Sequence, residues 1–166
     1  MKWEHLDRDH NILFPSDFRD FARLYGAGLI GDYISVSVPD SGNRFVDLLQ
    51  KSRDFVATLY GVRETLPTRM SYTLEPRGGG LIMWAANEDG DLCFWIVEGE
   101  DPDLWRVGIY SRNLNNWSEY SCGFVEFLVG VLSGAVESPF YRSDFPSKPI
   151  TFKTWRTHLD ELFAEN

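Results

Sequence analysis

Two apolar runs in the middle of the chain, residues 81–87 and 91–97, constrain the fold more than any other feature. They flank Glu88-Asp89-Gly90, and Asp-Gly between two strand-like runs is a strong hairpin signal. With Asp89-Gly90 as a two-residue loop, Trp84 is expected opposite Trp95, and both faces of the hairpin are apolar. A strand that is apolar on both sides belongs inside a sheet whose two faces are covered.

This register predicts which side chains share a face. One face is expected to carry Ile82, Trp84, Ala86, Cys93, Trp95 and Val97, and the other Leu81, Met83, Ala85, Leu92, Phe94 and Ile96. The Trp84–Trp95 pair favours core packing, because aromatic side chains dominate protein cores. The alternative is a partly open aromatic surface beside the acidic residues, suited to a protein partner.

Helical and strand periodicities surround the hairpin. Apolar residues at helical spacing predict three helices. The first follows Pro15, the second has Asn43 as its N-cap and Phe45 in its apolar stripe, and the third has Ser121 as its cap. Shorter strands are predicted at 33–38, at 71–74 and along Trp105, Val107 and Ile109. This order predicts an α+β domain with a central, mostly antiparallel sheet flanked by helices.

The length of 166 residues favours one domain, residues 1–166. Within it, 138–153 is expected to form an irregular, proline-containing arm and 154–165 a terminal helix. No apolar run approaches the roughly 20 residues of a membrane span, and the first residues resemble no secretory signal. Two isolated cysteines suit a reducing compartment, so a cytoplasmic location is expected.

Acidic residues outnumber basic ones by 25 to 16, giving a net charge of −9. Residues 78–103 contain seven acids and no Lys or Arg, so this segment holds most of the excess. Such a chain is not expected to bind nucleic acid or an anionic membrane, both of which require clustered basic residues. The acids are either solvated turn residues or a patch for a basic protein.

No motif predicts catalysis. Gly26-Ala27-Gly28-Leu29-Ile30-Gly31 has the glycine spacing of a dinucleotide-binding loop, but a predicted helix precedes it and a strand follows, the reverse of that fold. Glu88, Asp89 and Asp91 could offer oxygen ligands to a metal, yet no distant ligand completes a site. A fold can still assemble a triad from distant residues, so the missing motifs weaken an enzyme hypothesis without excluding one. We predict no catalytic residues, no metal site and no cofactor.

Several segments in order resemble the SUKH superfamily of SMI/KNR-type domains. Phe14-Pro15-Ser16-Asp17-Phe18 with Leu24 to Gly28 resembles the opening helix and glycine turn of the family. Gly78 to Ala85, the Asn-x-x-Gly-Asp hairpin, Phe94-Trp95 and Asp101 to Trp105 resemble its central block, and Phe124 to Leu132 its late helix. Ala85-Ala86 departs from the glycine usual after the Trp, and the tail from residue 138 has no match in the family pattern.

The resemblance implies a non-catalytic immunity protein that binds a cognate bacterial polymorphic toxin, for example a nuclease. A regulatory interaction module is the alternative, and a metal-dependent hydrolase using Glu88, Asp89 and Asp91 is a third hypothesis. The oligomeric state stays open. The basic toxin is expected to contact the acidic region and the two tryptophans: Glu88, Asp89, Asp91, Glu98, Glu100, Asp101, Asp103, Trp84 and Trp95.

Overall fold

The computed structural model describes Trp3 and residues 12–61, 72–73, 80–112, 115–136, 142, 144–146 and 148–164. Within this part of the chain the strands form one antiparallel sheet of order β6-β5-β4-β3-β2-β1-β7. The predicted α+β class is confirmed. The strands are β1 Gly28–Ile30, β2 Ile34–Val36, β3 Leu81–Asn87, β4 Leu92–Ile96, β5 Arg106–Ser111, β6 Asn116–Tyr120 and β7 Phe152–Thr154.

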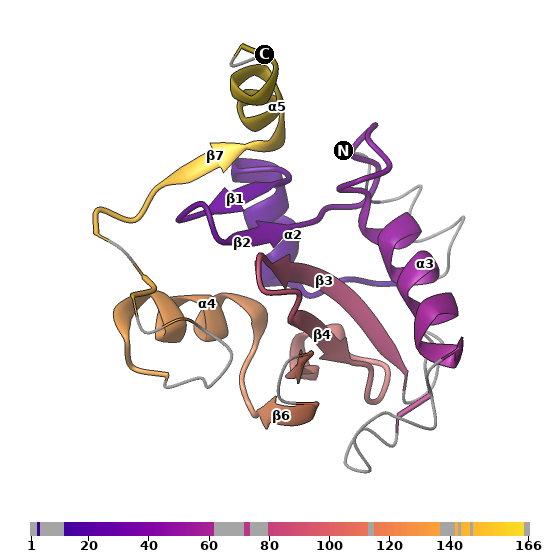
Figure 1. Cartoon of the computed structure of the whole chain (residues 1–166). Helices are drawn as coiled ribbons and strands as arrows, with labels where there is room; N and C mark the ends of the chain where they lie inside the picture. Colours follow the sequence, from indigo (N-terminus) through magenta and orange to yellow (C-terminus); the bar gives the residue numbers. More distant parts are fainter. Residues whose placement is uncertain are drawn as a thin grey trace.

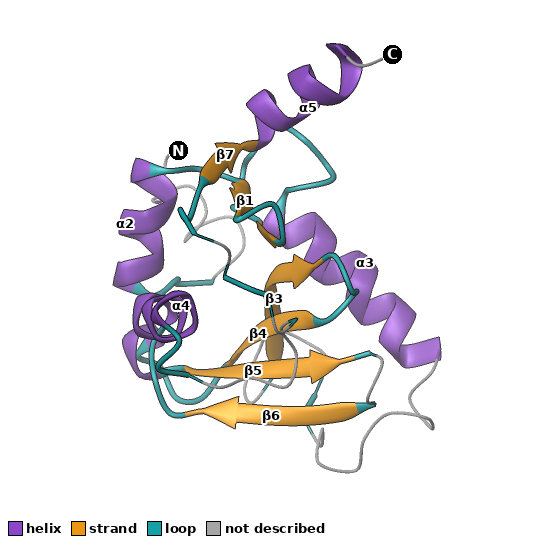
Figure 2. Ribbon diagram, turned by 60° about the vertical axis from the view of Figure 1, so that its left-hand side comes forward, coloured by secondary structure: helices purple, strands orange, loops and turns teal. Residues whose placement is uncertain are grey.

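Helices cover both faces of the sheet (Figures 1 and 2). Helices α2 (Ser16–Leu24) and α4 (Phe124–Ser133) lie on one face, and α3 (Leu48–Gly61) lies on the other. The larger apolar cluster is on the α2 and α4 side, and a smaller one, with Met83 and Phe94, is on the α3 side. The central, doubly covered position predicted for the two apolar strands is therefore confirmed.

The hairpin register differs from the expected one by a bulge at Trp84. Ile82 pairs with Trp95, Met83 with Phe94 and Ala85 with Cys93, so Trp84 is the extra residue of β3. A bulge of this kind interrupts the alternation of faces. Ala85 consequently lies in the larger cluster with Trp84, whereas strict alternation had assigned it to the opposite face.

The hairpin turn is also longer than expected. The amide of Gly90 donates to the carbonyl oxygen of Asn87 at 3.1 Å, and the amide of Asn87 donates to the carbonyl oxygen of Asp91 at 3.0 Å. Three residues, 88–90, therefore connect the strands. Gly90 has φ of +85°, a conformation that favours glycine.

Two predicted helix starts are wrong. Helix α3 begins at Leu48, and its N-terminal cap is Asp47, whose Oδ1 accepts from the amide of Gln50 at 3.0 Å. The side chain of Phe45, placed in the apolar stripe by its spacing, is 65% exposed. Helix α4 is preceded by Gly123 rather than capped by Ser121.

Three short strands were not predicted: β1, β6 and β7. Strand β7 begins inside the stretch expected to be irregular and extends one residue beyond it, and it pairs with β1 at one edge of the sheet. Of the strand expected at 71–74, Tyr72 and Thr73 are described, and Thr73 forms a single bridge with Gly80; the remainder is outside the described residues.

The terminal helix is α5, Trp155–Ala164, close to its predicted bounds. It projects away from the body of the molecule, and none of its side chains is buried (Figure 2). None of the described helices reaches the length and hydrophobicity that a bilayer span requires.

Candidate functional site

The seven acidic residues of the predicted interface fall into two groups. Glu88, Asp89 and Asp91 lie at the hairpin turn before β4, and the other four follow β4 at its opposite end. Because β4 has five residues, roughly 16 Å of strand separates the groups. The acids therefore do not form one continuous patch.

Two of the acids at the turn accept hydrogen bonds from neighbouring parts of the chain. Asp89 Oδ2 accepts a hydrogen bond from the Tyr33 hydroxyl at 2.5 Å. Burial, followed by this contact with Asp89, raises the pKa of Tyr33. Asp91 is only 5% exposed and accepts from the amide of Arg112 at 2.9 Å. Glu88 stays exposed, 3.9 Å from Arg142.

The acids after β4 organise a loop and the start of α2. Asp101 caps the short 3-10 helix η2 (Pro102–Leu104) by accepting from the amide of Asp103 at 3.0 Å. The Asp103 Oδ1 in turn accepts from the amide of Ser16, the first residue of α2, at 2.5 Å. Asp103 therefore stabilises a helix N-terminus 87 residues away in the sequence.

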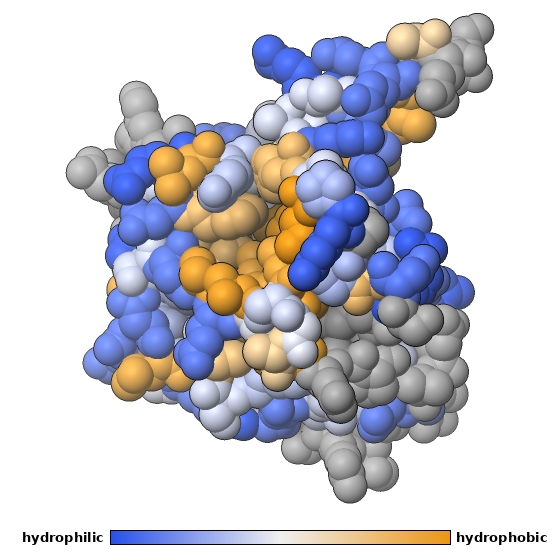
Figure 3. Space-filling view, turned by 90° about the vertical axis from the view of Figure 1, so that its left-hand side faces the viewer, coloured by the Kyte–Doolittle hydropathy of each residue, from blue (hydrophilic) through white to orange (hydrophobic). Residues whose placement is uncertain are grey.

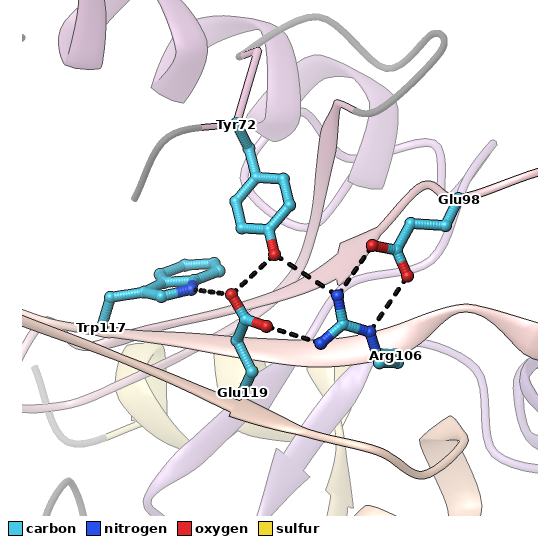
Figure 4. A network of polar contacts seen from close by, with 5 residues as sticks. All are labelled: Tyr72, Glu98, Arg106, Trp117 and Glu119. Carbon is cyan, nitrogen blue, oxygen red and sulfur yellow. Dashed lines mark hydrogen bonds and ion pairs between the residues drawn. The ribbon is translucent and has the colours of Figure 1, made fainter. Parts of the chain in front are cut away.

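Glu98 belongs to a polar network centred on Arg106 (Figure 4). Arg106 donates to both Glu98 oxygens, at 3.0 and 2.7 Å, and to Glu119 Oε2 at 2.5 Å. The other oxygen of Glu119 accepts from the Tyr72 hydroxyl at 2.6 Å and from the Trp117 indole N–H at 2.8 Å. The network thus joins Tyr72 to strands β5 and β6.

The network lowers the pKa of both carboxyl groups. The hydrogen bonds from Arg106 lower the pKa of Glu98. Burial by itself would raise the pKa of Glu119, but hydrogen bonds from Tyr72, Trp117 and Arg106 together lower it. One guanidinium is shared by two carboxylates, so the network as a whole keeps one net negative charge while its carboxylate oxygens are held inside the chain.

Both tryptophans of the predicted interface are core residues. Trp84 and Trp95 are 0% exposed, and their ring centroids lie 4.9 Å and 6.1 Å from that of Phe124. The favoured interpretation, core packing, is confirmed. Their alternative role as exposed anchors for a partner is wrong, because other side chains cover both rings completely.

An exposed apolar hollow lies elsewhere, between α2, α4 and residues 150–152. Figure 3 shows it as an orange hollow bordered by hydrophilic residues. This apolar groove has a volume of about 610 Å³. It is lined by Asp17, Asp20, Phe21, Leu24, Tyr25, Ile30, Val125, Leu128, Val129, Leu132, Ile150, Thr151 and Phe152.

The sequence of α4 contains a signal for this groove. The helix buries Phe127 and Val131 against the sheet, yet Val125 and Val129, four residues apart, are 39% and 58% exposed. A helix that is apolar on all sides is normally covered on all sides. Leu24, at the end of α2, adds a side chain that is 72% exposed.

The charged residues that line the groove, among those described, are both acidic. Asp17 Oδ2 accepts from the amide of Val125 at 2.8 Å and so caps α4 from a neighbouring helix. Asp20 pairs with Arg23 at 2.9 Å on the exposed side of α2. Through the Ser16–Asp103 bond, the acidic loop after β4 lies at the same end of α2 as Asp17.

No group of three or more His, Cys, Asp or Glu side chains among the described residues is arranged to hold a metal ion. Comparisons with protein-family models, curated proteins and solved structures find no match.

Proposed function

We propose that this chain is a non-catalytic immunity protein that binds a cognate bacterial toxin with a basic surface and neutralises it. The observation that carries the proposal is the open apolar groove. Contiguous exposed apolar surface destabilises a free protein in water and marks sites of protein interaction. The groove holds Leu24 and Val129, both more than half exposed, and its charged lining residues are acidic.

The charge of the chain supports the same class of partner. A net charge of −9 creates a field that speeds the approach of a cationic protein. A nuclease matches this charge, because it needs basic residues to hold phosphates. The resemblance to SUKH immunity domains points in the same direction.

The contact surface we propose differs from the acidic stretch predicted from sequence. Most of those acids are hydrogen-bonded within the chain, although Glu98, Asp101 and Asp103 are exposed as well as Glu88 and Glu100. In this proposal, the exposed acids attract the partner at long range, and the groove provides the contact that retains it. A contact role for the individual acids stays a prediction.

Co-expression with the toxin encoded beside this gene tests the proposal. We expect growth to be restored and the two purified proteins to elute as one complex, with an association rate that falls as salt increases. Changing Glu88 and Glu100 together to lysine should slow association and leave the dissociation rate nearly unchanged. Continued toxicity, with no complex at micromolar concentrations, would show that this is not the toxin's immunity protein.

A further inference from the structure

We propose that the apolar groove binds one amphipathic, cationic helix of the partner protein. The inference rests on the proposed function and specifies the chemistry of the occupant. Apolar side chains of that helix would lie against Leu24 and Val129, and its Lys or Arg residues would face Asp17 and the nearby Asp103 at the start of α2.

The walls of the groove suit a helix. Helices α2 and α4 form two sides of it, and a third helix can pack against such a pair as in a helical bundle. The ten residues of α4 span about 15 Å, which equals nearly three helical turns. Helix-in-groove recognition uses apolar residues at positions i, i+3, i+4 and i+7, which cover a similar length.

An added strand fits this site less well. The strand at the groove is β7, which has only three residues and forms one of the two edges of the described sheet. Strand addition draws its affinity from a row of main-chain hydrogen bonds, so a short edge offers little.

Charge argues against a second copy of this chain as the occupant. Its own exposed amphipathic helix is α5, with Leu162 and Phe163 at 46% and 76% exposure. That helix carries Asp160 and Glu161 against the single Arg156, and each copy has a net charge of −9. Docking α5 on the groove would bring these acids toward Asp17 and Asp20, whereas a cationic helix is attracted there.

Three synthetic peptides of about fourteen residues test the helix and its charge. All carry leucine at the i, i+3, i+4 and i+7 positions; the first has lysine elsewhere, the second has glutamate, and the third is the lysine peptide with a central proline. We expect the lysine peptide to bind in fluorescence anisotropy, and the glutamate and proline peptides to bind at least about tenfold more weakly. Equal binding by the proline peptide would overturn a helical occupant.

Variants of the groove separate specific docking from general attraction to an acidic protein. Leu24→Gln and Val129→Gln remove apolar contact without changing charge, and each should weaken the lysine peptide at least about fivefold. Phe45→Gln is the matched control, because Phe45 is 65% exposed and outside the groove. Unfolding curves for all three variants check that the fold is intact.

The outcomes distinguish this inference from the proposed function. Equal peptide binding by Val129→Gln and the unchanged protein would overturn the groove as the docking site. If Val129→Gln also protects fully against the toxin, the immunity function stands and another surface provides it. A homodimer in solution that Val129→Gln dissociates would identify a second copy as the occupant and overturn the cationic helix.

Discussion

Single carboxylates connect segments that are far apart in the chain. Asp17 is the clearest case: its side chain lies in the first turn of α2, yet it accepts from the amide of Val125 in α4 at 2.8 Å. Helix α4 begins at a glycine and has no side-chain cap of its own. Asp17 therefore replaces the Ser, Thr, Asp or Asn that would normally precede such a helix.

Replacing Asp17 by alanine should lower the free energy of unfolding by about 1 kcal/mol, because an amide of α4 loses its acceptor. Asp20→Ala is the matched control on the same helix: Asp20 contacts only the exposed Arg23 among the described partners, so its change should stay within about 0.5 kcal/mol. Urea unfolding of the two variants measures the difference. Equal effects would show that the contact with Val125 contributes no stability.

Arg106 is a second single residue with an effect on stability, and this effect depends on pH. It lowers the pKa of Glu98 and contributes to lowering that of Glu119, so their contribution to stability is present above pH 4.5 and is lost as pH falls through the lowered values. Arg106→Met should destabilise the protein by about 1 kcal/mol at pH 7, given the partial exposure of the network.

The difference between Arg106→Met and the unchanged protein should shrink as the carboxyl groups become protonated below pH 4. Urea unfolding at several pH values follows it. Arg23→Met, which breaks the exposed pair with Asp20, should show no comparable pH dependence. A difference that stays constant down to pH 3 would mean that Arg106 acts through packing alone.

At the scale of elements, α4 has two apolar faces with different roles. Phe127 is 0% exposed, and its replacement by alanine should cost about 3–5 kcal/mol of unfolding free energy. Val129 is 58% exposed, so Val129→Ala should change stability by less than about 0.5 kcal/mol. A large loss of stability in Val129→Ala would show that the outer face is structural.

The two apolar hairpin strands were predictable from the sequence, whereas β1, β6 and β7 were not. Strands β3 and β4 follow from two apolar runs and an Asp-Gly turn, which local sequence determines. Strands β1 and β7 have three residues each and depend on their tertiary partners: β1 lies between β2 and β7, and β7 pairs with β1. The bulge at Trp84 was not predicted, because strict alternation of faces assumes that each residue of β3 pairs with one residue of β4.

The candidate site was less predictable than the fold. The sequence shows that acids gather in 78–103, but not that Asp103 caps α2 or that Arg106 binds Glu98. Those partners depend on tertiary contacts. The exposed pair Val125 and Val129 could have been recognised in the sequence as a sign of the groove. The position of the groove, however, depends on how α4 packs beside α2.

At the scale of the whole molecule, the two apolar clusters share strands. Trp84 and Trp95 lie on one face of β3 and β4, while Met83 and Phe94 of the same strands contribute to the cluster that holds Trp117. Neither cluster can separate without disrupting the other. We therefore expect the two clusters to unfold in one cooperative transition.

Tryptophan fluorescence and far-ultraviolet circular dichroism should give coincident urea curves. Trp117→Phe removes the fluorescence of the smaller cluster and should leave the midpoint of the remaining signal equal to that of circular dichroism. Two separated midpoints in either protein would show that the faces of the sheet unfold independently.

The carboxylate contacts at the start of α2 and α4 also affect how the groove receives a ligand. Asp103 fixes the first turn of α2, and Asp17 fixes α4 to it, so both helical walls are joined at one end before any partner arrives. A site that is already ordered loses little conformational entropy on association. The binding energy gained from apolar contact is then retained as affinity rather than consumed in assembling the walls.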